Sequence, residues 1–271
     1  MIAWLADPLT TGAYIWRLER ADGIALGFTS HDTDIWKDGF RYRAAPGMIP
    51  TSISVSDSLE IDNVEIDGIV SSTAIVGRDL EEGRWNGARL TLSWANWTDP
   101  DQPAWQLITG EFGEIRRTGD AFSVEILGSP VFLDAPIVPE TSPTCRAHFG
   151  DRQCKISRAK FQRIAEVSEI ENGNPIFATL GGSANTYGSG ELRWLSGVNA
   201  GLSTTIIAVA DDALLLAEVP MRPILIGDRA LLTEGCPKDF ASCRDRFNNT
   251  QNFRGEPYLP GNDLLTRYPG G

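Results

Sequence analysis

The chain has 271 residues, of which 42% are apolar and 22% charged, and its formal net charge at pH 7 is −12. This is the composition of an ordinary globular protein with enough apolar residues for a sizeable core, and the length favours two domains. The acidic excess argues against tight sequence-independent binding to DNA, which depends on Lys and Arg neutralising phosphates.

Neither a signal peptide nor a membrane-spanning segment is expected. Residues 1–14 contain Asp7 and lack the basic segment that opens a secretory signal. The longest apolar runs, 206–210 and 213–217, are too short to cross a bilayer. We therefore expect a soluble protein made in the cytosol, where clustered thiols more often hold metal than form disulfides.

The negative charge is concentrated in the first half of the chain. Residues 1–140 contain 22 acidic and 10 basic residues, whereas residues 141–271 contain 14 of each. Four prolines are spaced around this boundary, at Pro130, Pro136, Pro139 and Pro143. We predict an acidic first domain over 1–140 and a second domain over 141–271.

The first domain is predicted to be β-rich. Alternating and β-branched runs predict strands over residues 14–19, 23–29, 53–56, 59–66, 88–97, 105–114 and 121–127. The sequence from Arg20 to Gly23 contains Asp-Gly and predicts the turn of a hairpin. A short helix is predicted over 79–85.

The second domain is predicted to contain a small β-barrel. Short strands separated by Gly-rich turns are expected over residues 158–170, 175–180, 191–195, 203–210, 212–218 and 229–233. The Gly-rich segment 181–190 lacks the Lys-Ser/Thr ending of a phosphate loop, and we interpret it as a mobile hairpin connection. A loop-rich tail is expected over 244–271.

Four cysteines in two couples bracket the β insert at about 158–233. Eight residues separate Cys145 from Cys154, six separate Cys236 from Cys243, and the chain has no other cysteine. Four thiolates form the ligand set of a tetrahedral zinc site or of an iron–sulfur cluster. A metal centre bound by both couples would join the two ends of the insert. Because this cross-link would restrict a long loop in the unfolded chain, it would contribute several kcal/mol to the stability of the fold.

Two parts of the chain resemble a known family. The run from Gly235 to Pro257, followed by Pro260-Gly261, resembles the tail-tip signature of siphophage hub proteins, including the tail-tip L protein of lambdoid phages and the hub of gene transfer agents. The start of the same family is similar to residues 26–35, Asp38-Gly39, 79–84 and 110–114.

The resemblance implies a structural, non-enzymatic baseplate hub at the tail tip of a phage-like particle, assembled in the bacterial cytoplasm. Such hubs are homotrimers that lie below a ring of distal tail protein and continue the tail channel, through which DNA passes without specific binding. They contact a larger megatron-like tip protein, and a tail-associated peptidase is a further expected partner. Glu256 departs from the family pattern, which has an apolar residue before Pro257.

The L-like members carry an iron–sulfur cluster, and the matching ligands here are Cys145, Cys154, Cys236 and Cys243. The spacings are wide for structural zinc, whose paired ligands usually enclose about two to four residues. An anionic cluster also suits the basic residues nearby, which are Arg146, Arg152, Lys155, Arg158, Lys160 and Arg163. We predict a [4Fe-4S] cluster, with zinc as the runner-up; inert buried thiols and two disulfides remain alternatives.

Further residues are predicted to surround the cysteines. His148 is either a ligand, a hydrogen-bond partner of a cluster sulfur, or a loop residue that packs beside Phe149. Phe247 and Phe253 are expected to shield the site or to belong to an ordinary core. Polar side chains expected near the site are Arg152, Asn248, Asn249, Asn252 and Arg254.

An acidic stretch in the first domain contains no basic residue. Its carboxylates are Asp57, Glu60, Asp62, Glu65 and Asp67. They form either a solvated strand face or the lining of a channel, where negative charge repels the DNA backbone and keeps it from binding. The spacing of a calcium loop is absent.

Two enzymatic alternatives have less support. An iron–sulfur redox enzyme or sensor would need a substrate pocket or an exposed cluster, and the sequence contains no nucleotide or flavin motif in support of it. A cell-wall hydrolase would need a nucleophile and a base, but metal binding would occupy every cysteine and the chain has 2 histidines. We interpret His31-Asp32 as the start of a turn in which Asp32 or Asp34 bonds local backbone.

Overall fold

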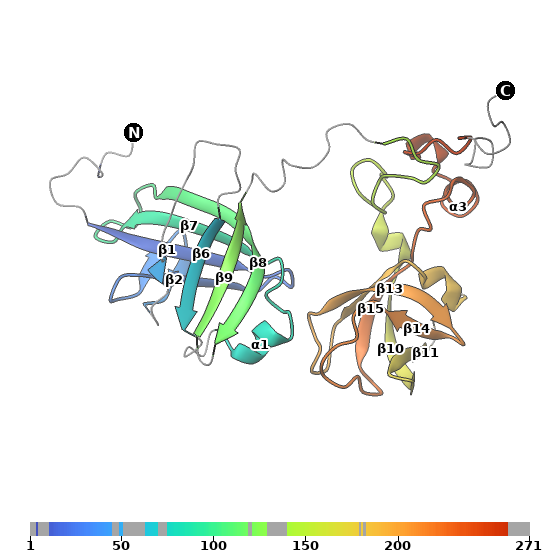
Figure 1. Cartoon of the computed structure of the whole chain (residues 1–271), viewed down its shortest axis with the longest axis horizontal. Helices are drawn as coiled ribbons and strands as arrows, with labels where there is room; N and C mark the ends of the chain where they lie inside the picture. The colour runs from blue at the N-terminus through green and yellow to red at the C-terminus, as the bar shows by residue number, and fades with distance from the viewer. Residues whose placement is uncertain are drawn as a thin grey trace, which may run out of the picture. The chain divides into compact units, whose positions relative to one another are not determined.

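The computed structural model describes residues 4, 11–44, 49–50, 63–69, 75–118, 121–128, 140–178, 180 and 183–259. The chain divides into two compact units, Met1–Ile137 and Val138–Gly271, each of which is described by itself (Figure 1). Among the described helices, none has the length and apolar character needed to cross a membrane.

The first unit is built on an antiparallel seven-stranded sheet with the strand order β2-β1-β7-β8-β9-β6-β5. The strands are β1 (Gly12–Glu19), β2 (Ala25–Thr29), β5 (Ile49–Pro50), β6 (Asn63–Ile69), β7 (Arg89–Asn96), β8 (Trp105–Thr118) and β9 (Ala121–Gly128). A separate hairpin is formed by β3 (Ile35–Lys37) and β4 (Phe40–Tyr42).

Successive side chains of β1 point to opposite faces of this sheet, and the strand contributes apolar side chains to both. Trp16 and Leu18 are fully buried in a core that Leu80 of α1 (Gly77–Glu81) and Trp85 complete. Ala13 and Ile15 point the other way and pack with Ile35 and Tyr42 of the β3–β4 hairpin and with Ala95. Both faces of β1 are therefore covered by apolar packing, as its apolar content demands.

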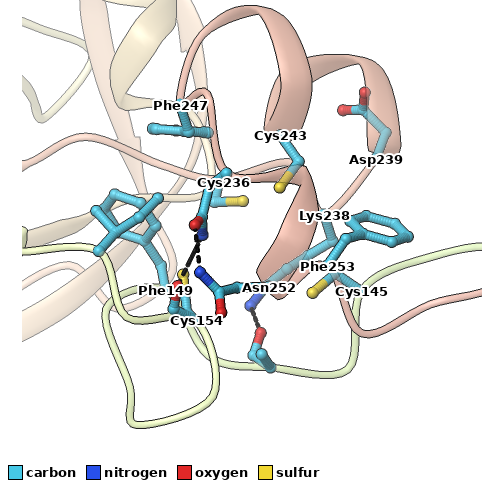
Figure 2. Close-up of a pocket in the computed structure, with 13 residues that line it drawn as sticks. Cys145, Phe149, Cys154, Cys236, Lys238, Asp239, Cys243, Phe247, Asn252 and Phe253 are labelled. Carbon is cyan, nitrogen blue, oxygen red and sulfur yellow. Dashed lines mark hydrogen bonds between the residues drawn. The ribbon is translucent and has the colours of Figure 1, made fainter.

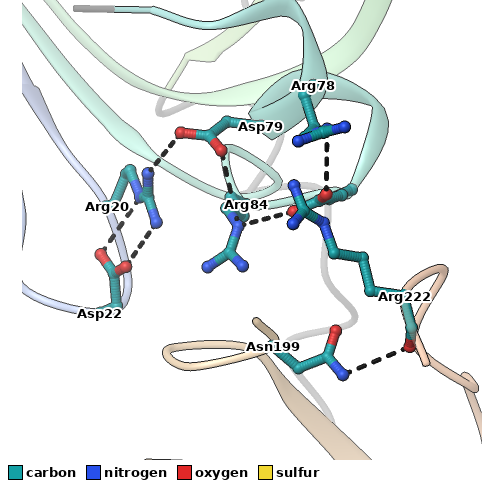
Figure 3. A network of polar contacts seen from close by, with 8 residues as sticks. Arg20, Asp22, Arg78, Asp79, Arg84, Asn199 and Arg222 are labelled. Carbon is teal, nitrogen blue, oxygen red and sulfur yellow. Dashed lines mark hydrogen bonds and ion pairs between the residues drawn. The ribbon is translucent and has the colours of Figure 1, made fainter. Parts of the chain in front are cut away.

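A buried ion network fastens α1 to the turn between β1 and β2. The Arg20 guanidinium lies 2.5 Å from Asp22 and 3.4 Å from Asp79, and Figure 3 shows these ion pairs. It also covers the ring of Trp85, 5.3 Å from the ring centroid. Asp79 also pairs with Arg84 at 3.6 Å. Because the Arg20 side chain is only 6% exposed, its carboxylate partners are needed to balance its charge.

The second unit contains a closed antiparallel barrel of six strands in the order β10-β11-β14-β13-β12-β15. They are β10 (Gln162–Glu171), β11 (Asn174–Ala178), β12 (Glu191–Trp194), β13 (Ser203–Ala210), β14 (Ala213–Leu216) and β15 (Arg229–Thr233). Every second residue of β12 and β15 is buried, and Leu192 lies opposite Leu232 in the β12–β15 pair. The barrel interior is thus a packed apolar core.

Close backbone contact determines where the chain leaves the barrel. A Cβ at Gly190 would lie 2.2 Å from the Thr233 carbonyl oxygen, and one at Gly235 would lie 1.8 Å from the Gly188 carbonyl oxygen. Only glycine fits such distances. The end of β15 is therefore held against this turn, immediately before Cys236.

The mainly β architecture and the small barrel predicted from the sequence are confirmed. The helix predicted over 79–85 instead spans Gly77–Glu81, and turns follow it to 87. The hairpin interpretation of 181–190 is wrong, because β11 and β12 are not neighbours in the barrel and the described part contains the 3-10 helix η3 (Ala184–Tyr187). The β3–β4 hairpin and α3 (Phe240–Asp245) were not predicted from the sequence.

We predict that Arg20→Ala lowers the free energy of unfolding by about 2–3 kcal/mol, because Asp22 and Asp79 lose their buried cation. Urea unfolding followed by tryptophan fluorescence measures this, since seven of the eight tryptophans precede residue 140. Arg17→Ala is the matched control: Arg17 pairs with Glu19 at the surface, and its loss is expected to change stability by less than about 1 kcal/mol. Equal effects of the two changes would contradict this assignment.

Candidate metal centre

Cys145 and Cys154 lie in a first loop, whereas Cys236 lies in a second loop that leads into α3, the helix that contains Cys243. In the first loop the Asp151 carboxylate accepts hydrogen bonds from the backbone N–H groups of His148 (2.8 Å), Gln153 (2.8 Å) and Cys154 (2.6 Å). These bonds, that of Cys154 above all, hold the pKa of Asp151 below its usual value. In the second loop Asp239 caps α3 by accepting from the Ser242 N–H at 2.7 Å.

The two loops are joined directly through Lys238. Its carbonyl oxygen accepts the backbone N–H of Cys145 at 2.8 Å, and its ammonium group donates to the carbonyl oxygen of Ala147. Lys238 has a φ of 65° and Lys155, next to Cys154, has a φ of 62°. Left-handed conformations are rare for lysine, so both loops hold strained backbone beside a cysteine.

The C-terminal segment passes over the first couple and completes the site. The backbone N–H of Arg254 donates to the Cys145 sulfur at 3.4 Å, and the Arg254 carbonyl oxygen accepts the N–H of Arg146 at 3.0 Å. The next residue must be small, because a Cβ at Gly255 would lie 2.5 Å from the Thr144 carbonyl oxygen.

Aromatic packing and one arginine attach this assembly to the barrel. Phe149, Phe161 and Phe247 form a cluster with ring centroids 5.1–5.6 Å apart. Arg246 donates to the carbonyl oxygens of Gly235 (3.0 Å) and Thr186 (3.1 Å) and pairs with Glu234. The first loop, α3 and the end of the barrel are therefore one packed structure.

All four cysteines line the same pocket, together with apolar side chains that include Phe149, Phe247 and Phe253. Figure 2 shows the four sulfur atoms turned toward this common interior. Burial, followed by the charges of the other three thiolates, raises the pKa of Cys243 to about 11, and burial also raises that of Cys236. Four thiolates in this pocket would repel one another, so a bound cation would stabilise the deprotonated set.

The distances between the four thiols help to decide whether a zinc ion or an iron–sulfur cluster fits the pocket. Among the described residues, no group of three or more possible ligands is close enough to hold a single metal ion. Around one zinc ion the sulfurs lie about 2.3 Å from the metal and hence within about 4 Å of each other. The sulfurs of a [4Fe-4S] site bind different irons and lie farther apart. The free space between the thiols is about 10 Å³, room for one water, so a cluster would require the thiols and the side chains around them to move apart.

The other residues proposed from the sequence divide into two groups. Phe247 and Phe253 line the pocket, and Arg254 contributes its backbone N–H to Cys145. His148 and Arg152 are exposed and do not line the pocket. Their roles at the site stay predictions.

The acidic stretch of the first unit is only partly described. Asp57, Glu60 and Asp62 lie outside the described residues, and Glu65 and Asp67 occupy β6. His31 lies in a bend over residues 30–33, where its Nδ1, and not a neighbouring carboxylate, accepts from the Thr33 N–H at 3.1 Å. Asp34 bonds the backbone N–H of Ala44 at 2.8 Å.

Glu256, the departure from the family pattern, has a structural role. Its carboxylate forms two bonds with the Arg146 guanidinium, at 2.7 and 2.8 Å, and accepts the Ser142 N–H at 2.9 Å. The bonds from Arg146 and then from Ser142 lower the pKa of Glu256 from 4.5 to about 2. The pair holds the C-terminal segment beside Cys145, which an apolar residue could not do. No obvious sequence signal links residues 146 and 256.

Comparison with known proteins agrees with this architecture. Residues 1–157 match the family described as "Baseplate hub protein, N-terminal attachment domain", and residues 185–263 match "Phage conserved hypothetical protein BR0599". A solved chain from the virion of a native gene transfer agent (GTA) particle is 32% identical, with a TM-score of 0.80 over 99% of this chain and 94% of that chain. No curated protein matches the sequence. The chain therefore belongs to the baseplate hub protein family.

We predict that Glu256→Gln lowers the Tm at pH 7 and that the difference from wild type closes as the pH falls toward 2. The folded-state pKa lies below the ordinary value, so the ionised carboxylate stabilises the fold above about pH 4.5 and this contribution is lost on acidification. Thermal unfolding at several pH values measures it. A Tm difference of equal size at pH 7 and pH 2 would contradict the assignment.

Proposed function

We propose that this chain is a structural hub at the tail tip of a phage-like or gene-transfer-agent particle, and that its four cysteines hold a [4Fe-4S] cluster. The observation that carries the cluster assignment is the convergence of all four thiols, from segments about ninety residues apart, on one pocket. The particle assignment rests on the hub family and on the similarity to a chain of a GTA virion.

The residues around the thiols have different roles. Lys238 joins the two loops, the Arg254 N–H donates to the Cys145 sulfur, and the phenylalanines keep water from the pocket. A bound cluster would supply an inorganic cross-link among four sulfurs. The result is a staple across the base of the barrel, which stabilises the unit mainly by restricting the unfolded chain.

Zinc is the alternative occupant, and it would serve the same structural purpose. It requires the thiols to approach one another more closely than they do here. A redox sensor is less favoured, because apolar and aromatic side chains make up much of the pocket lining. We therefore propose a structural, non-catalytic role.

The acidic strand supports the channel part of the proposal. In the β6–β9 pairing, Glu65 lies directly opposite Glu125, and Asp67 lies two positions further along the same face. Like charges at directly opposed positions destabilise a sheet. The presence of two opposed acidic residues here therefore suggests that they have a function. A row of carboxylates facing a lumen would repel DNA phosphates and allow DNA to pass. Expected partners are two more copies of the chain, the distal tail protein, a larger tip protein and a tail-associated peptidase.

We expect purified wild-type protein, made without oxygen, to contain about four irons and four labile sulfides per chain. Cys236→Ser is expected to remove them and to prevent particle assembly, because the C-terminal segment loses its link to the first loop. Elemental analysis, sulfide determination and electron microscopy of particles measure this. Ser157→Ala, in the same unit but outside the pocket, is the control. Colourless protein that contains zinc would refute the cluster but not the hub.

We expect the double change Glu65→Lys and Asp67→Lys to reduce DNA delivery while tails still assemble. The matched control is Glu169→Lys with Glu171→Lys, which makes the same charge change at exposed positions of β10. Transfer assays combined with negative-stain microscopy distinguish the two variants. Normal delivery by the β6 variant would rule out the channel assignment.

A further inference from the structure

We propose that Asn249 is a positioning residue: it fixes the position of Cys154 relative to Cys243 and so holds the two cysteine couples in a defined arrangement. The inference deepens the proposed function, on which its cluster readouts rest. It depends on three hydrogen bonds made by this one residue.

Asn249 bonds to a cysteine of each couple. Its backbone N–H donates to the carbonyl oxygen of Cys243 at 2.9 Å. Its side-chain Nδ2 donates to the carbonyl oxygen of Cys154 at 2.7 Å and lies 3.8 Å from the Cys154 sulfur. Cys154 and Asn249 are 95 positions apart in the sequence, so a single side chain connects the first loop with the segment after α3.

Asn252 fixes which way the Asn249 amide points. Nδ2 of Asn252 donates to Oδ1 of Asn249 at 2.7 Å, so the other end of the Asn249 amide, its NH₂ group, faces Cys154. Both side chains are buried, with exposed fractions of 7% for Asn249 and 8% for Asn252. Buried amides are unfavourable unless they are bonded, and this pair satisfies itself while bonding the cysteine loop.

The remaining contacts of Cys154 explain why this bond matters. The N–H of Cys154 bonds Asp151 within its own loop, which shapes the loop but does not connect it with α3. Asn249 supplies that connection, and its NH₂ group lies close enough to the sulfur to interact with a thiolate. Hydrogen bonds to ligand sulfurs stabilise the more negative, reduced state of a cluster and raise its reduction potential.

The test compares Asn249→Ala and Asn249→Asp with Asn199→Ala. Asn199 is a matched control: it is a fully buried asparagine in the same unit that donates to backbone carbonyl oxygens, at 3.3 and 3.4 Å, and it does not line the cysteine pocket. Asn249→Asp keeps the acceptor for Asn252 but removes the donor to Cys154. Asn252→Ala keeps the donor and removes only its orienting partner, which provides a variant if the others fold poorly.

Two readouts are used, one with and one without the cluster. In metal-free protein the alkylation rate of Cys154, measured by mass spectrometry relative to Cys145, is expected to rise about tenfold in both Asn249 variants and to stay unchanged in Asn199→Ala. In loaded protein the Asn249 variants are expected to lose iron faster to a chelator and to show a more negative reduction potential.

The outcomes separate the two proposals. Unchanged Cys154 reactivity in both Asn249 variants, or an equal increase in Asn199→Ala, would overturn the positioning role. Wild-type protein that binds no iron would refute the cluster assignment, while the alkylation readout would still decide whether Asn249 positions Cys154.

Discussion

Bringing four thiols into one partly buried pocket is the constraint on which the second unit depends. Desolvation and the mutual repulsion of thiolates both oppose it, as the raised pKa of Cys243 shows. Many short polar contacts around the pocket offset the desolvation and the repulsion. Asp151 and Asp239 shape the two loops, Lys238 joins them, and Arg254 donates a backbone N–H to a sulfur. These contacts bring the two cysteine couples together around the pocket.

The barrel provides the rigid base for this arrangement. The pairing of β12 with β15 places the end of β15 against the turn at Gly188–Gly190, and Cys236 follows two residues after Glu234. The first loop returns to the same end through the Phe149, Phe161 and Phe247 cluster. A metal centre bound at this point would join segments that the barrel has already brought together, so the barrel and the proposed centre would reinforce one another.

Family membership and the physical analysis support each other at particular residues. The segment 79–84, which resembles the start of hub proteins, supplies Asp79 and Arg84 to the ion network around Arg20. Glu256, the departure from the family pattern, is bonded to Arg146 beside the first cysteine. A family pattern therefore identifies the important segment, and the contacts explain why a given side chain stands there.

The sequence alone indicated most of the described strands of both units and the four cysteines as candidate ligands. Alternation in segments such as 191–195 and 229–233 is a local property, and the four cysteines are the whole supply. The bond from Asn249 to Cys154, the pairing of Arg146 with Glu256 and the register of Glu65 against Glu125 were decided only by the tertiary structure. Each joins residues about sixty or more positions apart, and local periodicity carries no information about which distant groups meet.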